Sequence, residues 1–297
     1  MRGIPSNAPF SWQMLKWIKN LSMTSNEEEA LMQTLTWRVV GASVQGASHL
    51  EADLPCQDAH HYQSLSDGTL LLAVADGAGS AARSQEGSRC VVEQALATLA
   101  AELDTQPPAD EVAWREVMTR AFAAAHTALN ELAATAQVSP RLFATTLTVA
   151  VLTEAWLVVG QLGDGCVVAQ TADGPLFTAI RPQRGEYANT TYFLGTPRVL
   201  DHVEFAVYTE PIQALALTTD GLLRLALTLP ELEPYPRFFD PLFAFAAGLT
   251  DQATAETHLT AFLASERVSS RTEDDKTLVI AARVAAGSAA VSPLDLP

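Results

Sequence analysis

Several short apolar runs in this sequence stop abruptly at an aspartate. LLLAVA at residues 70–75 is followed by Asp76 and Gly77, and ALALTT at residues 214–219 is followed by Asp220 and Gly221. Apolar runs of this length, bounded by turn residues, are typical of β-strands. The chain is therefore expected to fold around sheets whose strand ends carry carboxylates.

Two segments between the groups of strands have the apolar spacing of long helices, residues 80–103 and 111–136. The short turns between the strands after Pro140 predict antiparallel neighbours, and residues 175–198 are expected to form a surface loop or flap. A further helical region is expected over residues 240–263. The other strands are predicted at residues 36–46, 143–152, 155–163, 166–170, 203–209 and 277–284. Strands, then helices, then strands, without β-α-β alternation, predict an α+β fold of antiparallel sheets sandwiched by helices.

The predicted folded domain covers residues 37–284. A chain of 297 residues is near the upper size for one hydrophobic core, so one large domain is expected. Residues 1–36 mix aromatic, basic and acidic side chains without the pattern of a core element, and are expected to be a flexible or partner-docking extension. Residues 285–297 are expected to be a C-terminal tail.

Composition excludes several classes of function. The net charge of −16 would repel a phosphate backbone, so no nucleic-acid partner is expected. Cys56, Cys90 and Cys166 are odd in number and far apart, which argues against a disulfide framework and a zinc site and favours a reducing cytoplasm. No segment has the apolar length of a membrane span. The motifs GxGxxG, GxxxxGK[ST] and GxSxG are absent.

Acidic residues recur at predicted strand ends and turns. An aspartate beside a glycine is a common turn signal, and this interpretation fits each site taken alone. The set as a whole also fits a site for a hard divalent cation, which prefers oxygen ligands from carboxylates, carbonyls and water. The sites are Gln57-Asp58, Asp76-Gly77, Asp164 between two glycines, Asp220-Gly221 and Asp274-Asp275.

In this order, the motifs resemble those of the metal-dependent protein phosphatases, also called type 2C or PPM phosphatases. The resemblance covers about residues 37–284 and suggests a divergent bacterial-type branch. Its elements are the acidic pair Gln57-Asp58, DGxGS at residues 76–80, TTL at 145–147, VGQLGDG at 159–165, TDG at 219–221 and DDxT at 274–277.

The resemblance implies a four-layer αββα sandwich with two Mn²⁺ or Mg²⁺ ions, and with a possible third. Asp76 would bridge both metals, the Gly77 carbonyl would bind one, and Asp220 and Asp274 would hold the other. Asp274 is preferred over Asp275 by counting back from the threonine of the family's DNxT pattern. Two further residues would complete the site, Asp58 directly or through water and Asp164 at the third metal.

Several family features are missing from this chain. The arginine that grips phosphate is absent, with Asp53 at its position and His49 as the nearest substitute. Gln57 stands where the family has an acidic residue, and Cys166 stands where it has an arginine. Ala78 replaces the histidine that acts as a general acid in many relatives. Arg83 could bind phosphate, although an exposed helical arginine more often faces solvent. His60 and His61 could transfer protons, although histidines in loops usually have no catalytic role. Arg181, Arg184 and Glu186 in the predicted flap could select substrates, and a solvated loop is the alternative.

The leading hypothesis is a serine/threonine protein phosphatase in which a metal-activated water attacks phosphorus without a covalent intermediate. Its partners would be a phosphorylated protein and a cognate kinase, and a monomer is expected. The missing arginine and histidine motivate an alternative, a weak or inactive relative that binds phosphoproteins. A third hypothesis is a hydrolase of small phosphate esters with the same metal site.

Overall fold

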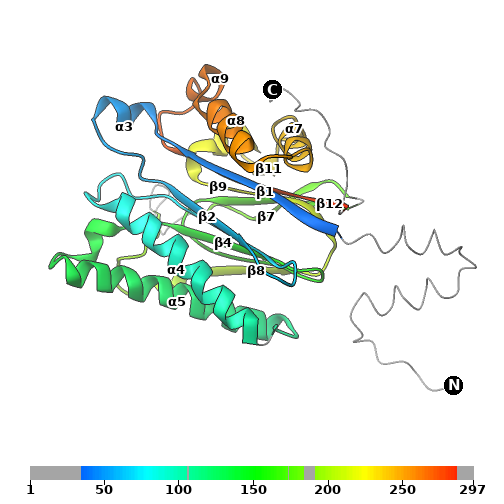
Figure 1. Cartoon of the computed structure of the whole chain (residues 1–297). Helices are drawn as coiled ribbons and strands as arrows, with labels where there is room; N and C mark the ends of the chain where they lie inside the picture. The colour runs from blue at the N-terminus through cyan, green and yellow to red at the C-terminus, as the bar shows by residue number, and fades with distance from the viewer. Residues whose placement is uncertain (1–34, 106, 173, 184–190, 286–297) are drawn as a thin grey trace, which may run out of the picture.

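The structure is a computed structural model that describes residues 35–105, 107–172, 174–183 and 191–285. Two five-stranded antiparallel sheets lie face to face at its centre (Figure 1). The first sheet has the order β1 (Leu35–Val44), β12 (Lys276–Ala285), β9 (Ile212–Thr218), β6 (Cys166–Thr171) and β7 (Leu176–Ile180). The second has the order β2 (Ala59–Ser64), β3 (Leu70–Ala75), β4 (Leu147–Leu152), β5 (Leu157–Leu162) and β8 (Glu204–Tyr208).

Helices cover the outer face of each sheet, so the described chain has the four layers that the sequence predicts (Figure 1). The second sheet is covered by α4 (Ser84–Thr105) and α5 (Glu111–Thr135), and the first by α7 (Pro236–Ala247) and α8 (Gln252–Ala264). Shorter elements are α3 (Ala47–Glu51), α6 (Leu223–Ala226), α9 (Glu266–Ser269), β10 (Leu227–Thr228), β11 (Glu233–Pro234) and the 3-10 turns Pro140–Phe143, Val199–His202 and Asp220–Leu222.

Burial on both faces explains why the central strands are almost wholly apolar. In β3, Leu71 and Ala73 pack against the helices, whereas Leu70 and Leu72 pack against the other sheet. Because successive side chains of a strand point to opposite faces, a strand between two apolar layers needs apolar residues at every position. All six residues of β3 are buried.

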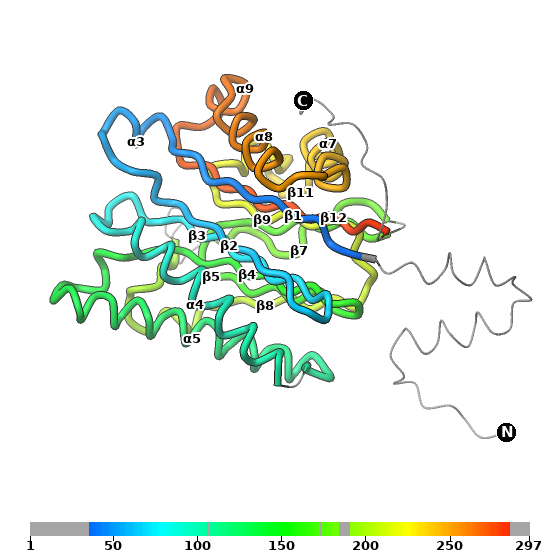
Figure 2. The backbone as a smooth tube through the Cα atoms, viewed as in Figure 1, coloured from blue at the N-terminus to red at the C-terminus, as the bar shows by residue number. Residues whose placement is uncertain are grey.

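The polypeptide reverses direction many times at one end of the sandwich, where α3 also lies (Figure 2). Strands β3, β5 and β9 end there, and β12 begins there opposite the end of β1. All the sites of the predicted acidic set flank these strand ends or β2. The topology therefore places the acidic residues at one end of the sheets.

Three predicted elements differ from the structure. The predicted helix at residues 240–263 is two helices, because α7 ends at Gly248 and the Asp251 side chain caps α8 by accepting a hydrogen bond from the Thr254 amide. The strand β6 does not pair with β5; the turn at residues 163–165 carries the chain into the other sheet. The predicted loop at residues 175–198 begins with a strand, β7.

The predicted N-terminal extension and C-terminal tail lie largely outside the described residues, and their boundaries stay predictions. The strands β1 and β12 extend the folded region by two residues and one residue beyond the predicted limits of 37 and 284. Among the described residues, no helix has the length and apolar character needed to span a membrane.

We expect Leu71→Ala to lower the free energy of unfolding by about 2–5 kcal/mol, because it removes a fully buried side chain between β3 and the helices. Urea denaturation followed by circular dichroism measures the change. Leu50→Ala is the matched control, since Leu50 is 62% exposed and its truncation should change stability by less than about 0.5 kcal/mol. Equal losses in the two variants would contradict the described packing.

Candidate metal centre

Three of the predicted aspartates meet at the acidic end of the sandwich. Asp76 follows β3, Asp164 lies in the turn between β5 and β6, and Asp220 follows β9. One carboxylate oxygen from each lies within 4.8 Å of those of the other two. Residues 56 to 144 positions apart in the sequence thus converge because their strands end at the same place.

The backbone of Asp76 is fixed by the two threonines that precede β4. The Asp76 amide donates a hydrogen bond to Thr146 Oγ1 over 2.8 Å. The Asp76 carbonyl accepts hydrogen bonds from the Thr146 amide over 2.8 Å and from Thr145 Oγ1 over 2.9 Å. These bonds saturate the Asp76 main chain, so its carboxylate is held at a defined place at the strand end.

Asp58 is buried beside this group, with 7% of its surface exposed. Its Oδ2 accepts a hydrogen bond from Thr219 Oγ1 over 2.8 Å. The Thr219 Oγ1 atom in turn accepts a hydrogen bond from the Thr277 amide over 3.2 Å. Burial raises the pKa of Asp58 to about 8, despite the opposing hydrogen bonds from Thr219 and Thr277, and the charges of Asp275 and Asp220 add to the rise.

The two aspartates before β12 have different environments. Asp275 is 2% exposed, and its oxygens accept hydrogen bonds from the Gly46 and Gln57 amides, each over 2.6 Å. Asp274 is exposed, and its Oδ1 accepts a hydrogen bond from the Asp275 amide over 2.9 Å. Asp275 therefore joins the segments of Gly46 and Gln57 to the start of β12, whereas the second carboxylate oxygen of Asp274 accepts no hydrogen bond from the described residues.

Burial and mutual repulsion together determine the electrostatics of the acidic group. The pKa of Asp76 is raised well above its usual value by burial and then by the charges of Asp58 and Asp220, with Asp274 and Asp164 contributing as well. Burial likewise raises the pKa of Asp220 to about 7, with further increases from Asp164 and Asp274. Divalent cations would relieve this repulsion, and an all-oxygen donor set suits hard ions such as Mg²⁺ and Mn²⁺.

Two glycines allow the backbone to pack closely around this group. A Cβ on Gly77 would lie 2.6 Å from the Gln57 carbonyl oxygen and 2.8 Å from Ser84 Cβ. A Cβ on Gly221 would lie 1.9 Å from the Asp275 carbonyl oxygen. Any larger residue at either position would push apart segments that carry the aspartates, which explains the glycine after Asp76 and after Asp220.

The predicted phosphate-binding residue Arg83 has other partners. Its guanidinium forms a two-pronged ion pair with Glu86, with hydrogen bonds of 2.6 and 2.5 Å, and it lies 4.4 Å above the Phe143 ring centroid. A phosphate would have to displace the carboxylate of Glu86. A phosphate role for Arg83 therefore stays a prediction that nothing in these contacts favours.

The remaining predicted residues are dispersed. Asp53 is exposed, Ala78 is buried, and Arg181 pairs with Glu233 at 3.6 Å. Cys56 and Cys90 are partly buried, whereas Cys166 is buried at the start of β6. Arg184 and Glu186 lie outside the described residues.

Sequence reasoning missed three polar residues that support the aspartates. Thr191 Oγ1 donates a hydrogen bond to Asp164 Oδ2 over 2.6 Å. Gln183, which is 8% exposed, accepts one from the Gly163 amide over 2.7 Å. Lys276 is 1% exposed and donates to the Gln45 carbonyl over 3.4 Å. Lys276 directly precedes the predicted strand at residues 277–284, and its burial is unusual, because buried lysines are rare.

Comparison with known proteins agrees with this geometry. The sequence model of the family described as protein phosphatase 2C matches residues 45–264. The chain belongs to this family. It is 36% identical over 258 residues to serine/threonine-protein phosphatase 3 of Escherichia coli (strain K12), an alignment that covers 83% of this chain and 98% of that protein.

Solved structures support the fold. PppA, described as a key regulatory component of T6SS in Pseudomonas aeruginosa, superposes with a TM-score of 0.56 and 17% identity, covering 84% of this chain and all of PppA. Serine/threonine phosphatase Stp1 from Staphylococcus aureus superposes with a TM-score of 0.56 and 14% identity, and the match covers 83% of this chain and 95% of Stp1. At these identities the likeness shows the four-layer fold of family members and nothing more specific.

The raised carboxyl pKa values predict how stability depends on pH. The pKa of Asp58 rises from 3.8 to about 8, and that of Asp220 from 3.8 to about 7. At a pH between the unfolded and the folded pKa of each group, the folded protein therefore binds more protons than the unfolded chain. The free energy of unfolding of chelator-treated protein should therefore fall as pH rises from about 4 to about 8. Urea denaturation at pH 5.5 and pH 8 measures the difference.

Asp76→Asn should reduce this pH dependence, because it removes one of the repelling charges. Asp240→Asn is the matched control, since Asp240 is exposed on α7. Added Mn²⁺ should restore stability to the wild-type protein at pH 8. A rise of stability with pH in the chelated protein would contradict the electrostatic account.

Proposed function

We propose that this protein is a divalent-metal-dependent phosphatase of phosphoserine and phosphothreonine in proteins. The observation that carries the proposal is the convergence of the Asp76, Asp164 and Asp220 carboxylates in a chain of the protein phosphatase 2C family. Asp76 and the Gly77 carbonyl would hold one ion, and Asp76, Asp220 and Asp274 a second. Asp164, with Asp220, would serve a third, weaker position, and Asp58 would support the site from behind.

The residues present fit such ions. The donors are oxygen atoms only, and burial together with repulsion between the carboxylates raises the pKa of Asp76 and Asp220. Gln57 Oε1 is buried and accepts no hydrogen bond from the described residues, so it can accept one from a water in the site. These features support two divalent ions and a third, with Mn²⁺ or Mg²⁺ as the expected metal.

The chemistry of the ions, when bound, is to acidify a coordinated water and to neutralise the oxygens of the phosphate. The chain itself holds the aspartates at fixed strand ends, through the threonine hydrogen bonds to Asp76 and Asp58. No cysteine is suited to covalent catalysis, because burial raises the pKa of Cys166 to about 12 and also raises that of Cys56 and Cys90. Direct attack by water on phosphorus is therefore favoured.

The comparisons favour an enzyme over a phosphoprotein-binding module, because the matched relative is named a phosphatase and aligns over nearly its full length. The substrate would be a phosphorylated protein, and its cognate partner a serine/threonine kinase. A monomer in a reducing cytoplasm is the expected state, and the three free cysteines fit that compartment. Turnover of phosphoproteins compared with free phosphate esters would separate this function from a small-ester hydrolase.

Asp76→Asn should abolish most activity while leaving the fold intact. We expect kcat/KM for a phosphoserine peptide with Mn²⁺ to fall at least about 100-fold, because even outer-shell losses at metal sites cost about 10–100-fold. Calorimetric titration should show weaker Mn²⁺ binding. Asp240→Asn should retain wild-type values. Wild-type protein that releases no phosphate from phosphopeptides with Mn²⁺, together with unchanged metal binding in Asp76→Asn, would refute the proposal.

The adjacent aspartates should separate metal binding from stability. Asp274→Asn should weaken Mn²⁺ binding and change the free energy of unfolding by less than about 0.5 kcal/mol, because the residue is exposed. Asp275→Asn should lower the free energy of unfolding by about 1–3 kcal/mol, because it disrupts buried hydrogen bonds to the Gly46 and Gln57 amides. Calorimetric titration with Mn²⁺ and urea denaturation of each variant test both expectations. Weaker Mn²⁺ binding in Asp275→Asn, with unchanged binding in Asp274→Asn, would make Asp275 the ligand.

A further inference from the structure

Hydrolysis of a phosphoserine leaves a serine oxygen with the electron pair of the broken P–O bond. Such an alkoxide is a poor leaving group, so a positioned acid that protonates it accelerates the reaction by about 10²–10⁴-fold. The aspartates of the candidate centre are proposed metal ligands and cannot serve this purpose. A protonatable side chain at the edge of the acidic end is therefore the group to seek.

His49 has this position. It lies on α3, where its Nδ1 is 2.9 Å from Asp275 Oδ2, and 12% of its side chain is exposed. The distance is that of an ion pair, although the angle does not make a hydrogen bond. No described residue makes a hydrogen bond with Nε2 of this ring. One ring nitrogen thus faces a carboxylate, and the other is left for a substrate.

The Asp275 carboxylate is a fixed support for the ring. The amides of Gly46 and Gln57 hold its two oxygens, and Ser48 binds the Glu273 carbonyl through its amide over 3.0 Å and its hydroxyl over 2.7 Å. Gly46 permits this contact, since a Cβ there would lie 2.3 Å from the Asp274 carbonyl carbon. The helix α3 is therefore pressed against the backbone of Asp274, a proposed metal ligand.

Three other basic side chains near the acidic end are already engaged. Arg83 is paired with Glu86, and Lys276 is buried with its Nζ against the Gln45 carbonyl. His60 packs inside the sandwich, where its Nδ1 lies 2.8 Å from Ser43 Oγ. Among the described residues that adjoin Asp274 and Asp275, His49 thus combines a basic ring with access to solvent.

We propose that His49, supported by Asp275, is the general acid that protonates the leaving oxygen of the substrate. The inference rests on the proposed phosphatase function. A fixed carboxylate beside Nδ1 sets the direction of Nε2, as in other catalytic pairs of aspartate and histidine.

In this step, water forms a new bond to phosphorus and gives its proton to solvent as the P–O bond to serine breaks. The electron pair of that bond stays on the serine oxygen, which takes the proton from His49 Nε2. The products are serine and inorganic phosphate, and the neutral His49 regains a proton from solvent. No oxidant or further reactant is needed.

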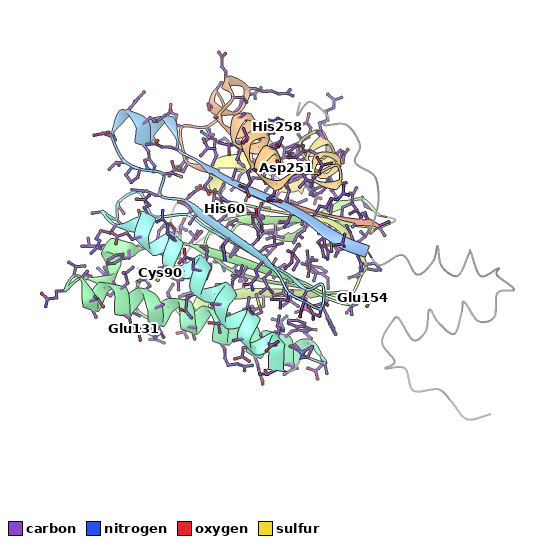
Figure 3. All side chains as sticks on the ribbon, in the orientation of Figure 1. His60, Cys90, Glu131, Glu154, Asp251 and His258 are labelled. Carbon is purple, nitrogen blue, oxygen red and sulfur yellow. The ribbon has the colours of Figure 1, made fainter. Side chains whose placement is uncertain are left out.

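The test compares substrates whose leaving groups differ in their need for a proton. p-Nitrophenolate leaves without one, whereas the serine of a phosphopeptide does not. In Mn²⁺-containing buffer we expect His49→Gln to lower kcat for a phosphoserine peptide about 100-fold or more and to lower kcat for p-nitrophenyl phosphate less than about 3-fold. His258→Gln is the matched control, because His258 is exposed on α8 (Figure 3).

A second variant and the wild-type enzyme make the test complete. His49→Ala should regain peptide hydrolysis when imidazole is added. In the wild-type enzyme, kcat across aryl phosphates should depend weakly on leaving-group pKa, and this measurement remains decisive if neither variant folds. Equal losses on both substrates in His49→Gln, or a steep dependence in the wild type, would overturn the inference. Absence of turnover on every substrate by the wild type would instead refute the proposed phosphatase function.

Discussion

Repulsion among carboxylates at one end of the sandwich is the constraint on which the rest of the structure depends. Asp58, Asp76 and Asp220 each have a raised pKa because burial and neighbouring charges disfavour their ionised forms. Such a group stays together only if the backbone that carries it is rigid. The described chain achieves this with strand ends inside two antiparallel sheets and with threonine hydroxyls that bind the Asp76 carbonyl and the Asp58 carboxylate.

The neighbouring aspartates before β12 have different functions. Asp275 is 2% exposed and Asp274 is exposed, so the two carboxylates have different environments. Asp275 is buried and fixes the segment that leads from β1 through α3 to Gln57, whereas Asp274 is near enough for its charge to raise the pKa of Asp76. A doubled acidic residue thus supplies one structural and one open carboxylate, and the structural one also reaches His49.

The sequence was sufficient to predict the layers, the two long helices and the location of the acidic residues, because strand burial and turn chemistry are local signals. The crossing of β6 into the other sheet was not predictable in this way, since the same short turn can join strands of one sheet or of two. The pairing of Arg83 with Glu86 also escaped, although the spacing of three residues on a helix allows it. The threonine hydrogen bonds to Asp76 depend on the pairing of β3 with β4, which is a tertiary contact.

Two residues near the acidic group share an electrostatic consequence. Gln57 brings no charge beside Asp58, and Lys276 places a cation inside the protein near Asp275, Asp274 and Asp58. Burial lowers the pKa of Lys276, but these carboxylates oppose the change and favour its charged form. Both features reduce the negative charge that the acidic end must hold. Lys276 therefore offsets, from within the fold, part of the repulsion that Asp58 and Asp274 bring to this end of the sandwich.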